Sequence, residues 1–430
     1  MTIRRTICSL VIAFGVCSFS NVSFANDGET KKGSSNWPSW RGVARDGVST
    51  EKGLLDQWKG DGPALLWSAS GYGGGFSSIV IAEGKIFSMG EIDGKCCVIA
   101  ASLSDGRILW KTPIGSGKPN CTPTFDDGVI YGLSEKGELA ACDASSGKVI
   151  WEKNYGRDFG GKMMSGWGYS ESPLIDGDRL ICTPGADGAM IAALNKKTGA
   201  VIWRTQVKDL GTRGQDGAGY ASIVISNAGK VKQYVTIVGR GLISVAADDG
   251  RLLWNYNKIA NGTANIPTPI VKGDYIFGST GYDDGGSALI KVTGGKGGVV
   301  DASEVWYKDN KQLQNHHGGV VLIGNYLYLG HGHNNGFPAC VEFMTGKDMW
   351  RPGRGPGTGS AALAAADGKL YFRYEDGVMA LMDANPKKFA LKGQFKIKTV
   401  HAQSWAHPVV LDGKLYLRDQ DELHCYDVKK

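Results

Sequence analysis

The chain has 430 residues, a formal net charge of +6 and a charged fraction of 21%, which is an ordinary composition for a globular protein. Arg4 and Arg5 carry two of these charges, and without them only +4 remains. So small an excess excludes the basic surface that nucleic-acid binding requires, and no nucleic-acid partner is expected.

Residues 1–25 have the features of a secretory signal peptide. Arg4 and Arg5 form a positive start, residues 7–19 are largely apolar, and Ser23-Phe24-Ala25 places small residues before a cleavage point. The apolar stretch is too short to span a membrane comfortably. We therefore expect cleavage near Ala25, a chain in the periplasm or outside the cell, and no transmembrane segment.

Residues 26–63 form a tail that contains the segment NWPSWRGVARDG. The sequence ALLWSAS follows and contains Trp67, and a short apolar strand is predicted there at residues 64–69. The tail precedes the repeating part of the chain, and we expect its tryptophans to anchor it on the surface of the fold.

Tryptophans recur from Trp67 onward at intervals of 41 to 52 residues. Most of them follow a glycine-containing turn and a short apolar run, as in SSGKVIW and KTGAVIW. A self-similar unit of this length, made of short strands and glycine turns, is typical of a β-propeller blade. We call these residues the ladder tryptophans: Trp67, Trp110, Trp151, Trp203, Trp254, Trp306 and Trp350.

Eight hairpins with alternating apolar residues around a tight turn accompany this ladder. Their inner strands follow Ser78, Pro123, Pro173, Ser222, Pro269, Gly319, Ala362 and Pro408. Seven hairpins have an outer strand of their own, the last of which ends near Phe395, and the eighth hairpin lacks one. The strand at 64–69 is predicted to fill that place and to close the ring. Residues 64–430 are thus predicted to form an all-β, eight-bladed propeller, with the ladder tryptophans wedged between neighbouring blades and the tail packed on the ring.

The repeated unit resembles that of the PQQ-like repeat propellers. It appears here as ALNKKTGAVIW, CDASSGKVIW and VEFMTGKDMW, and the resemblance covers residues 37–430. One branch of that family, the quinoprotein alcohol dehydrogenases, binds pyrroloquinoline quinone and calcium at the funnel of an eight-bladed propeller. Another, the outer-membrane assembly lipoprotein BamB, has no cofactor and acts as a scaffold. Segments such as GWGYSESPLIDGD and GHGHNNGFP resemble secreted BamB-like proteins often labelled polyvinyl-alcohol dehydrogenase. The resemblance implies the fold and leaves the activity open.

Two sets of loops share one face of a propeller: those that enter the inner strands and those that join the second and third strands. The unusual polar residues of the chain gather in these loops, and loops on a rigid scaffold commonly carry function. We call this side the funnel face. The predicted ligand-binding residues on it are Glu171, Tyr220, Asn265, His316, His317, His331, His333, Asn334, Trp405 and His407.

Four of the seven histidines lie between positions 316 and 333. His331 and His333 are two residues apart, so an extended backbone would point both rings the same way. Three interpretations stay open: a transition-metal site, contacts to a polar ligand, and hydrogen bonds to loop carbonyls. No carboxylate or cysteine stands at metal-ligand spacing in this loop, and no metal is predicted. Ordinary imidazoles titrate near neutral pH, so ligand binding is expected to change between roughly pH 5.5 and 7.5.

The quinoprotein branch implies a calcium site made of a Glu, an Asn and an Asp. Glu171, Asn265 and Asp283 or Asp284 match it by residue type, but the chain lacks the long loops and the CxxCH haem site of those enzymes. We predict that these residues do not converge and that no cofactor is bound. Aromatic residues that suit a glycan or planar ligand are expected at the same rim: Trp167, Tyr169, Tyr220, Tyr282, Phe337 and Trp405.

The functional prediction is an exported, non-catalytic scaffold that binds a ligand or a protein, without a catalytic residue. A quinone-dependent alcohol or polyol dehydrogenase and a polysaccharide-binding propeller are the alternatives. The expected partner at the funnel face is a small polar ligand, a glycan or a protein, and the chain is expected to be monomeric.

Overall fold

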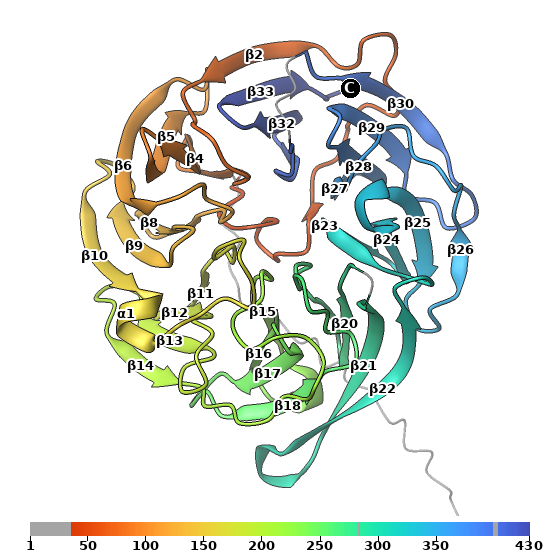
Figure 1. The fold of residues 1–430 in the computed structure, drawn as a ribbon. Helices are drawn as coiled ribbons and strands as arrows, with labels where there is room; N and C mark the ends of the chain where they lie inside the picture. The colour runs from red at the N-terminus through yellow and green to blue at the C-terminus, as the bar shows by residue number, and fades with distance from the viewer. Residues whose placement is uncertain (1–35, 283, 399–402) are drawn as a thin grey trace, which may run out of the picture. The chain divides into compact units, whose positions relative to one another are not determined.

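The computed structural model describes residues 36–282, 284–398 and 403–430, and the predicted signal peptide lies outside these ranges. Eight β-sheets follow one another around a ring (Figure 1). This arrangement confirms the predicted all-β, eight-bladed propeller. Short helical elements interrupt the strands of the described part: α1 (Tyr155–Phe159), η1 (Ala228–Lys230), η2 (Lys296–Gly298) and η3 (His333–Asn335).

Blades 1 to 4 each consist of four consecutive antiparallel strands. Blade 1 contains β3 (Val80–Ala82), β4 (Lys85–Ile92), β5 (Lys95–Ser102) and β6 (Ile108–Ser116). Blade 2 contains β7 (Thr124–Asp126), β8 (Val129–Leu133), β9 (Glu138–Asp143) and β10 (Val149–Asn154). Blade 3 contains β11 (Leu174–Asp176), β12 (Arg179–Cys182), β13 (Ala192–Asn195) and β14 (Val201–Arg204). Blade 4 contains β15 (Val224–Ser226), β16 (Gln233–Val238), β17 (Gly241–Ala246) and β18 (Leu252–Tyr256).

Blades 5 to 7 repeat this order, and blade 8 draws on both ends of the propeller sequence. Blade 5 contains β19 (Ile270–Lys272), β20 (Tyr275–Ser279), β21 (Gly286–Gly294) and β22 (Val300–Asp309). Blade 6 contains β23 (Asn315–Ile323), β24 (Tyr326–His331), β25 (Phe337–Glu342) and β26 (Asp348–Trp350). Blade 7 contains β27 (Ala361–Ala366), β28 (Lys369–Tyr374), β29 (Val378–Asp383) and β30 (Leu391–Lys396). Blade 8 contains β31 (Val409–Leu411), β32 (Lys414–Asp419), β33 (Glu422–Asp427) and β2 (Leu65–Ser70).

Strand β2 closes the ring. It pairs antiparallel with β33, with Trp67 opposite Cys425 and Ala69 opposite Leu423. The predicted strand at 64–69 is therefore confirmed to within one residue. The pairing covers the edge of β33 that would otherwise be free to pair with another chain.

The outer strand of every blade carries a β-bulge. In β10, Val149 pairs with Cys142 and Trp151 pairs with Ala141, which leaves Ile150 as the extra residue. The same register shift precedes the other ladder tryptophans. A bulge re-aims the side chain that follows it. The apolar residue before five of the seven tryptophans is exposed (Ile150 is 50% exposed), and these five indoles turn toward the next blade.

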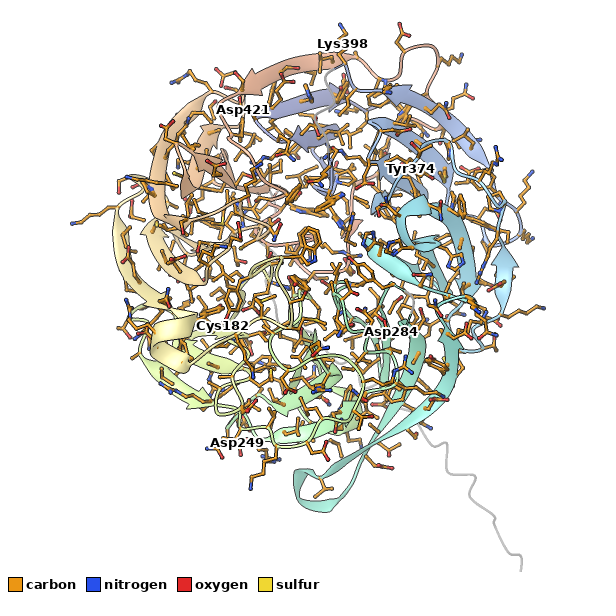
Figure 2. The ribbon with its side chains drawn as sticks, in the orientation of Figure 1. Cys182, Asp249, Asp284, Tyr374, Lys398 and Asp421 are labelled. Atoms are coloured by element: carbon orange, nitrogen blue, oxygen red, sulfur yellow. The ribbon has the colours of Figure 1, made fainter. Side chains whose placement is uncertain are left out.

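Most ladder tryptophans lie against a turn glycine of the next blade. A Cβ added to Gly250, in the turn marked by Asp249 in Figure 2, would lie 2.3 Å from Cε3 of Trp203. Gly106, Gly147, Gly199 and Gly346 meet Trp67, Trp110, Trp151 and Trp306 in the same way. All five glycines have φ between 69° and 76°, where other residues are strained. The prediction that the ladder joins neighbouring blades is confirmed by these contacts.

Three blade junctions differ. Trp350 meets a turn of blade 7 that contains no glycine, and its indole N–H donates to the carbonyl of Asn385 at 2.8 Å. Blade 5 lacks the usual turn because η2 lies between β21 and β22, and Trp254 instead donates a hydrogen bond to Gln233 of its own blade, at 2.8 Å. In blade 7 Phe395 replaces the tryptophan, and a Cβ on Gly62 would lie 2.5 Å from its ring. The close ring–glycine contact thus persists where the aromatic residue changes.

The segment from Trp37 to β1 (Val48–Ser49), drawn in red, crosses the middle of the ring (Figure 1). Trp37 exchanges two backbone hydrogen bonds with Ile81 of blade 1. The buried Arg45 donates to the carbonyls of Ser172 and Pro173 at the start of blade 3. Strand β1 then adds to β27 of blade 7 in parallel, with Val48 opposite Ala365. One short stretch therefore connects the inner strands of distant blades.

Side chains fill the space between neighbouring blades (Figure 2). The seven described cysteines are buried free thiols, and Cys182 marks this layer in blade 3. Burial raises the pKa of the Cys121 and Cys142 thiols to about 12, so they behave as apolar core groups. Within the described ranges no helix has the length and apolar character needed to cross a membrane.

Replacing Gly250 with Ala tests the contact between blades. Gly250 and Gly273 both have positive φ, at 74° and 57°, but a Cβ on Gly273 meets nothing within 4 Å. We expect Gly273→Ala to cost about 1–2 kcal/mol from backbone strain alone. Gly250→Ala should cost about 1–3 kcal/mol more, because the methyl group collides with Trp203. Equal costs in urea unfolding would contradict the proposed role of this contact.

Candidate functional site

A cavity of about 650 Å³ opens on the funnel face at the centre of the ring. Its walls come from the loops before the inner strands and from the loops between the second and third strands of several blades. Seven of the ten predicted site residues line it: Tyr220, His316, His317, His333, Asn334, Trp405 and His407. Trp167 and Tyr282 also line it, as predicted for the aromatic rim, whereas Tyr169 and Phe337 do not.

A bulge at the start of β23 presents His316 and His317 to the cavity. Asn315 pairs with His331 and Val320 pairs with Leu329, so the residues between Asn315 and Val320 leave the regular ladder. Gly318 lies so close to blade 7 that an added Cβ would be 1.6 Å from the carbonyl oxygen of Ala361. Gly319 has φ +74°. The histidines were predicted to precede the strand, and they lie inside it because two glycines make this bulge possible.

Five aromatic rings form a continuous arc along one side of the cavity, which we call the ring stack: Phe76, Trp405, His317, His316 and His333. The successive ring centroids are 4.1 to 4.5 Å apart. These residues come from blades 1, 8 and 6, so the arc exists only in the closed ring. Tyr282 of blade 5 packs edge-on against His316, with the centroids 5.0 Å apart.

Hydrogen bonds hold the middle of the ring stack. Nδ1 of His316 lies 2.7 Å from Oγ of Ser360, and Nε2 lies 3.0 Å from the hydroxyl of Tyr282. Ser360 donates its proton to Oδ1 of Asn334, so its oxygen accepts from His316. This pattern assigns the proton of a neutral His316 to Nδ1. Glu375 accepts from the indole N–H of Trp405 and from the backbone N–H of Ser360, at 3.1 Å for the latter.

Burial keeps the imidazoles of His316, His317 and His407 neutral across the physiological pH range. Burial, with His333 close by, lowers the pKa of His316 to about 3. Burial beside Arg41 lowers the pKa of His407 to about 3, and burial among the other imidazoles lowers that of His317 well below its ordinary value. The expectation of titration between roughly pH 5.5 and 7.5 is therefore wrong for His316 and His317, because an unperturbed pKa applies only to a hydrated ring.

The tail contributes Trp40 and Arg41 to the floor of the cavity, although neither is among the predicted site residues. Trp40 donates from Nε1 to Oγ1 of Thr268 at 3.1 Å and packs edge-on against His407. The buried Arg41 donates to the carbonyls of Asp46, at 2.8 Å, and Val320. The tail motif WPSWRG could have indicated this role, because it places Trp40 and Arg41 side by side, three residues after Trp37.

Three predicted site residues lie outside the cavity. Glu171 is buried; Oε1 accepts from the hydroxyl of Tyr155 at 2.9 Å and from the backbone N–H of Thr183 at 2.6 Å. Asn265 is buried and donates to the carbonyls of Val238 and Gly239. His331 accepts a hydrogen bond from the backbone of Gln314. It does not face the same way as His333, because Gly332 and His333 both have positive φ and break the extended backbone.

The positions of Glu171 and Asn265 show whether the described residues could form the calcium site of a quinoprotein. Asp283 lies outside the described residues. Glu171 and Asn265 do not line the cavity, and the side-chain amide of Asn265 is bonded at both ends, since its Oδ1 accepts from Asn261. Calcium requires six to eight converging oxygens. Within the described ranges no group of three or more His, Cys, Asp or Glu residues is placed to hold a metal ion. The described residues do not fit a quinoprotein calcium site.

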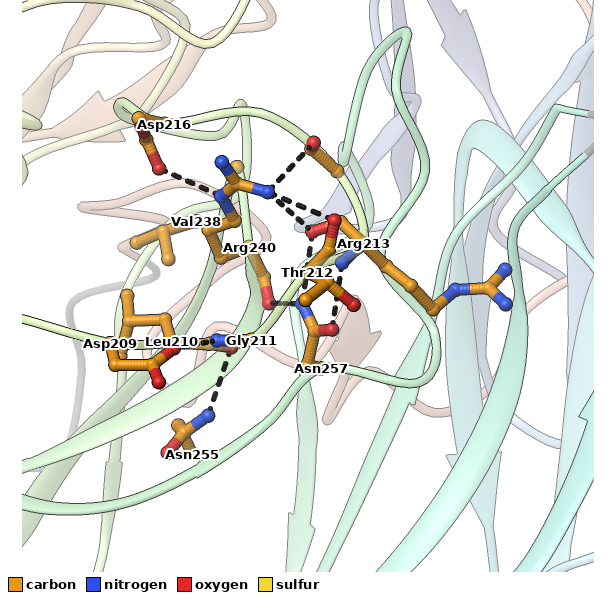
Figure 3. A network of polar contacts seen from close by, with 12 residues as sticks. Asp209, Leu210, Gly211, Thr212, Arg213, Asp216, Val238, Arg240, Asn255 and Asn257 are labelled. Atoms are coloured by element: carbon orange, nitrogen blue, oxygen red, sulfur yellow. Dashed lines mark hydrogen bonds and ion pairs between the residues drawn. The ribbon is translucent and has the colours of Figure 1, made fainter.

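A long loop between β14 and β15 borders the funnel face, and its residues 208–216 are held by a polar network (Figure 3). Arg240 pairs with Asp216 at 2.7 Å and donates to the carbonyl of Thr212. Asn257 donates to the carbonyls of Arg213 and Arg240. We call residues 208–216 the rim loop. It is largely exposed, and its backbone conformation is fixed by side chains of blade 4.

Comparison with known families agrees with this fold. A sequence profile described as outer membrane protein assembly factor BamB matches residues 94–352, more than half of the chain. The chain belongs to this family. The resemblance to PQQ-like repeat propellers is thereby confirmed.

Curated relatives are distant in sequence. BamB of Yersinia pestis is 21% identical over 287 residues, which cover 56% of this chain and 70% of that protein. BamB of Salmonella typhimurium is 30% identical over 107 residues, which cover 23% of this chain and 26% of that protein. The matches therefore span between about a quarter and seven tenths of these relatives.

Solved structures share the propeller fold. BamB from Moraxella catarrhalis has a TM-score of 0.61 and 15% identity, covering 85% of this chain and 99% of that chain. A europium-containing methanol dehydrogenase has a TM-score of 0.64 and 13% identity, covering 89% of each chain. Identities this low establish the architecture alone, so function depends on the site.

The lowered pKa of His316 predicts an acid-sensitive fold. Because the folded pKa of His316 lies below 6.5, the unfolded chain takes up a proton that the folded chain excludes, and the free energy of unfolding falls as the pH drops from 6.5 toward 3. His316→Gln removes this term. Its stability cost at pH 7 should shrink by roughly 2 kcal/mol at pH 4.5. Phe76→Leu, a change in the same ring stack without a titrating group, should cost the same at both pH values. A pH-independent cost for His316→Gln would contradict the assignment.

Proposed function

We propose that this protein is a non-catalytic scaffold that binds other proteins during the assembly of outer-membrane proteins. The observation that carries this proposal is membership of the BamB family over more than half of the chain. We further infer that the predicted signal peptide exports the chain to the periplasm, where such a factor acts, and that it works as a monomer without nucleic acid.

The chemistry of the cavity supports a binding role. Two carboxylates line it, and both have hydrogen-bond partners. Glu135 accepts from the backbone of Lys118 and from the side chain of Lys136, and Glu375 holds Trp405 and Ser360. A general base requires a carboxylate or imidazole free to take a proton from substrate. Burial lowers the pKa values of His316, His317 and His407 far below neutral pH, so these imidazoles are poor proton acceptors. We therefore infer neither catalysis nor a bound quinone.

The rim loop supplies the surface that we propose for protein docking. Its exposed residues lie on a backbone that Arg240 and Asn257 already hold, so binding would order little additional chain. Preformed loops of this kind lose less conformational entropy on association than flexible ones. The turns of the opposite face, such as the one containing Lys197, are short and regular.

Site-specific photocrosslinking in cells tests this function. A photoreactive residue at Thr212 in the rim loop should capture a protein of the outer-membrane assembly machinery, and one at Lys197 on the opposite face should not. Both positions are exposed. Arg240→Ala should lower the yield at position 212 by loosening the loop. Arg251→Ala, which breaks an exposed ion pair with Asp249, is the matched control and should leave the yield unchanged.

Equal capture at positions 212 and 197 would contradict docking through the rim loop. Loss of the chain should also reduce the amount of folded outer-membrane protein, measured by quantitative immunoblotting. Unchanged amounts would contradict the assembly function itself.

A further inference from the structure

We propose that the funnel cavity is a binding site for a neutral saccharide, with a pyranose ring against Trp167 and hydroxyl groups reaching the imidazoles of His317 and His333. This site goes beyond protein docking at the rim loop and does not depend on it. The argument rests on an open aromatic face, a polar wall without partners, and a balance of charge.

Trp167 provides the aromatic face. It lines the cavity, and its side chain is 56% exposed, whereas the other described tryptophans are buried or half-buried. Its backbone is fixed on both sides, since its carbonyl accepts from Asn120 at 2.9 Å and its N–H donates to the hydroxyl of Tyr220 at 3.3 Å. The fold therefore holds a large apolar ring at the cavity without covering it. Such rings give the C–H faces of sugars a stacking surface.

The ring stack provides the polar wall. Both ring nitrogens of His317 and Nδ1 of His333 are buried and have no hydrogen-bond partner among the described residues. Leaving such buried groups without a hydrogen-bond partner is unfavourable. A neutral imidazole carries one donor and one acceptor, which is the pattern that a hydroxyl group complements. A compound with several adjacent hydroxyls can satisfy more than one of these atoms at once.

The charges of the cavity favour an uncharged ligand. Its described lining contains two cations, Arg41 and Lys118, and two carboxylates, Glu135 and Glu375. These charges cancel, and Arg41 already donates to two carbonyls. Because the imidazoles next to them are neutral, the wall offers an anion no net attraction. An acidic sugar would lose its hydration and would meet no net counter-charge, since the two carboxylates balance the two cations.

The size of the cavity suits this class of ligand. About 650 Å³ lies within the range of roughly 300–1,000 Å³ that small-molecule sites occupy. Within the ring stack, Trp405 already packs against Phe76 and His317, with centroid distances of 4.4 and 4.5 Å. The open aromatic surface available to a ligand is thus Trp167, with the edges of the histidine rings beside it.

Titration of the purified full chain tests the proposal. The probes are maltose, cellobiose and N,N′-diacetylchitobiose as neutral disaccharides, digalacturonic acid as an acidic one, and sorbitol as an acyclic polyol. We expect saturable binding of at least one neutral disaccharide by calorimetry, with a change in tryptophan fluorescence. Trp167→Ala should weaken that binding at least tenfold, and His317→Gln at least threefold. Ile150→Ala, an exposed apolar residue on the outer strand of blade 2, should leave affinity unchanged.

Four results would overturn the proposal: no binding of any neutral disaccharide, binding of digalacturonic acid in preference to them, equal binding of sorbitol, or full affinity in Trp167→Ala. Because Trp167 is exposed, its replacement should leave the melting temperature unchanged, so this variant stays informative even if His317→Gln does not fold. The assay uses the isolated chain and no partner protein. Its failure would leave the crosslinking result untouched, and the reverse also holds.

Discussion

The contact on which this ring depends is a tryptophan lying against a glycine of the next blade. The β-bulge before each ladder tryptophan turns the indole out of its own sheet, and the turn glycine, with its positive φ, leaves room for the ring. Without the bulge the indole would stay in the pleat of its own blade, and with any other residue at the turn it would meet a Cβ. The contact recurs at five of the eight junctions between the described blades, where it fixes how neighbouring blades pack.

Closure of the ring is what makes the site. The ring stack joins residues from blades 1, 6 and 8, which are far apart in the chain and meet only when β2 completes blade 8. The tail adds the floor, because Trp40 and Arg41 lie on the segment that crosses the middle of the ring. The same crowding that brings the imidazoles together removes their water and keeps them neutral. Closure of the ring therefore both assembles the ring stack and lowers the pKa values of His316 and His317.

The regular spacing of tryptophans and hairpin turns in the sequence was enough to predict most of the fold, but it predicted much less of the site. The ladder tryptophans and the hairpin turns are local signals, so blade number and closure by the strand around Trp67 could be predicted. Residue type and loop position located Tyr220, His316 and Trp405 correctly at the cavity. They could not indicate that Glu171 turns into the core toward Tyr155 and Thr183, because this depends on neighbours distant in sequence. The bulge that displaces His316 could have been recognised from Gly318-Gly319, but burial of the ring, and with it the pKa, depends on the closed fold.

The most direct test of this account is the behaviour of chains that begin at residue 36 or at residue 71. The first keeps β2 and the central segment, and the second leaves the edge of β33 unpaired. Light scattering coupled to size-exclusion chromatography should find a monomer that unfolds cooperatively for the first, and aggregates for the second. A chain beginning at residue 71 that stays monomeric and unfolds in one cooperative transition would contradict closure of the ring by β2.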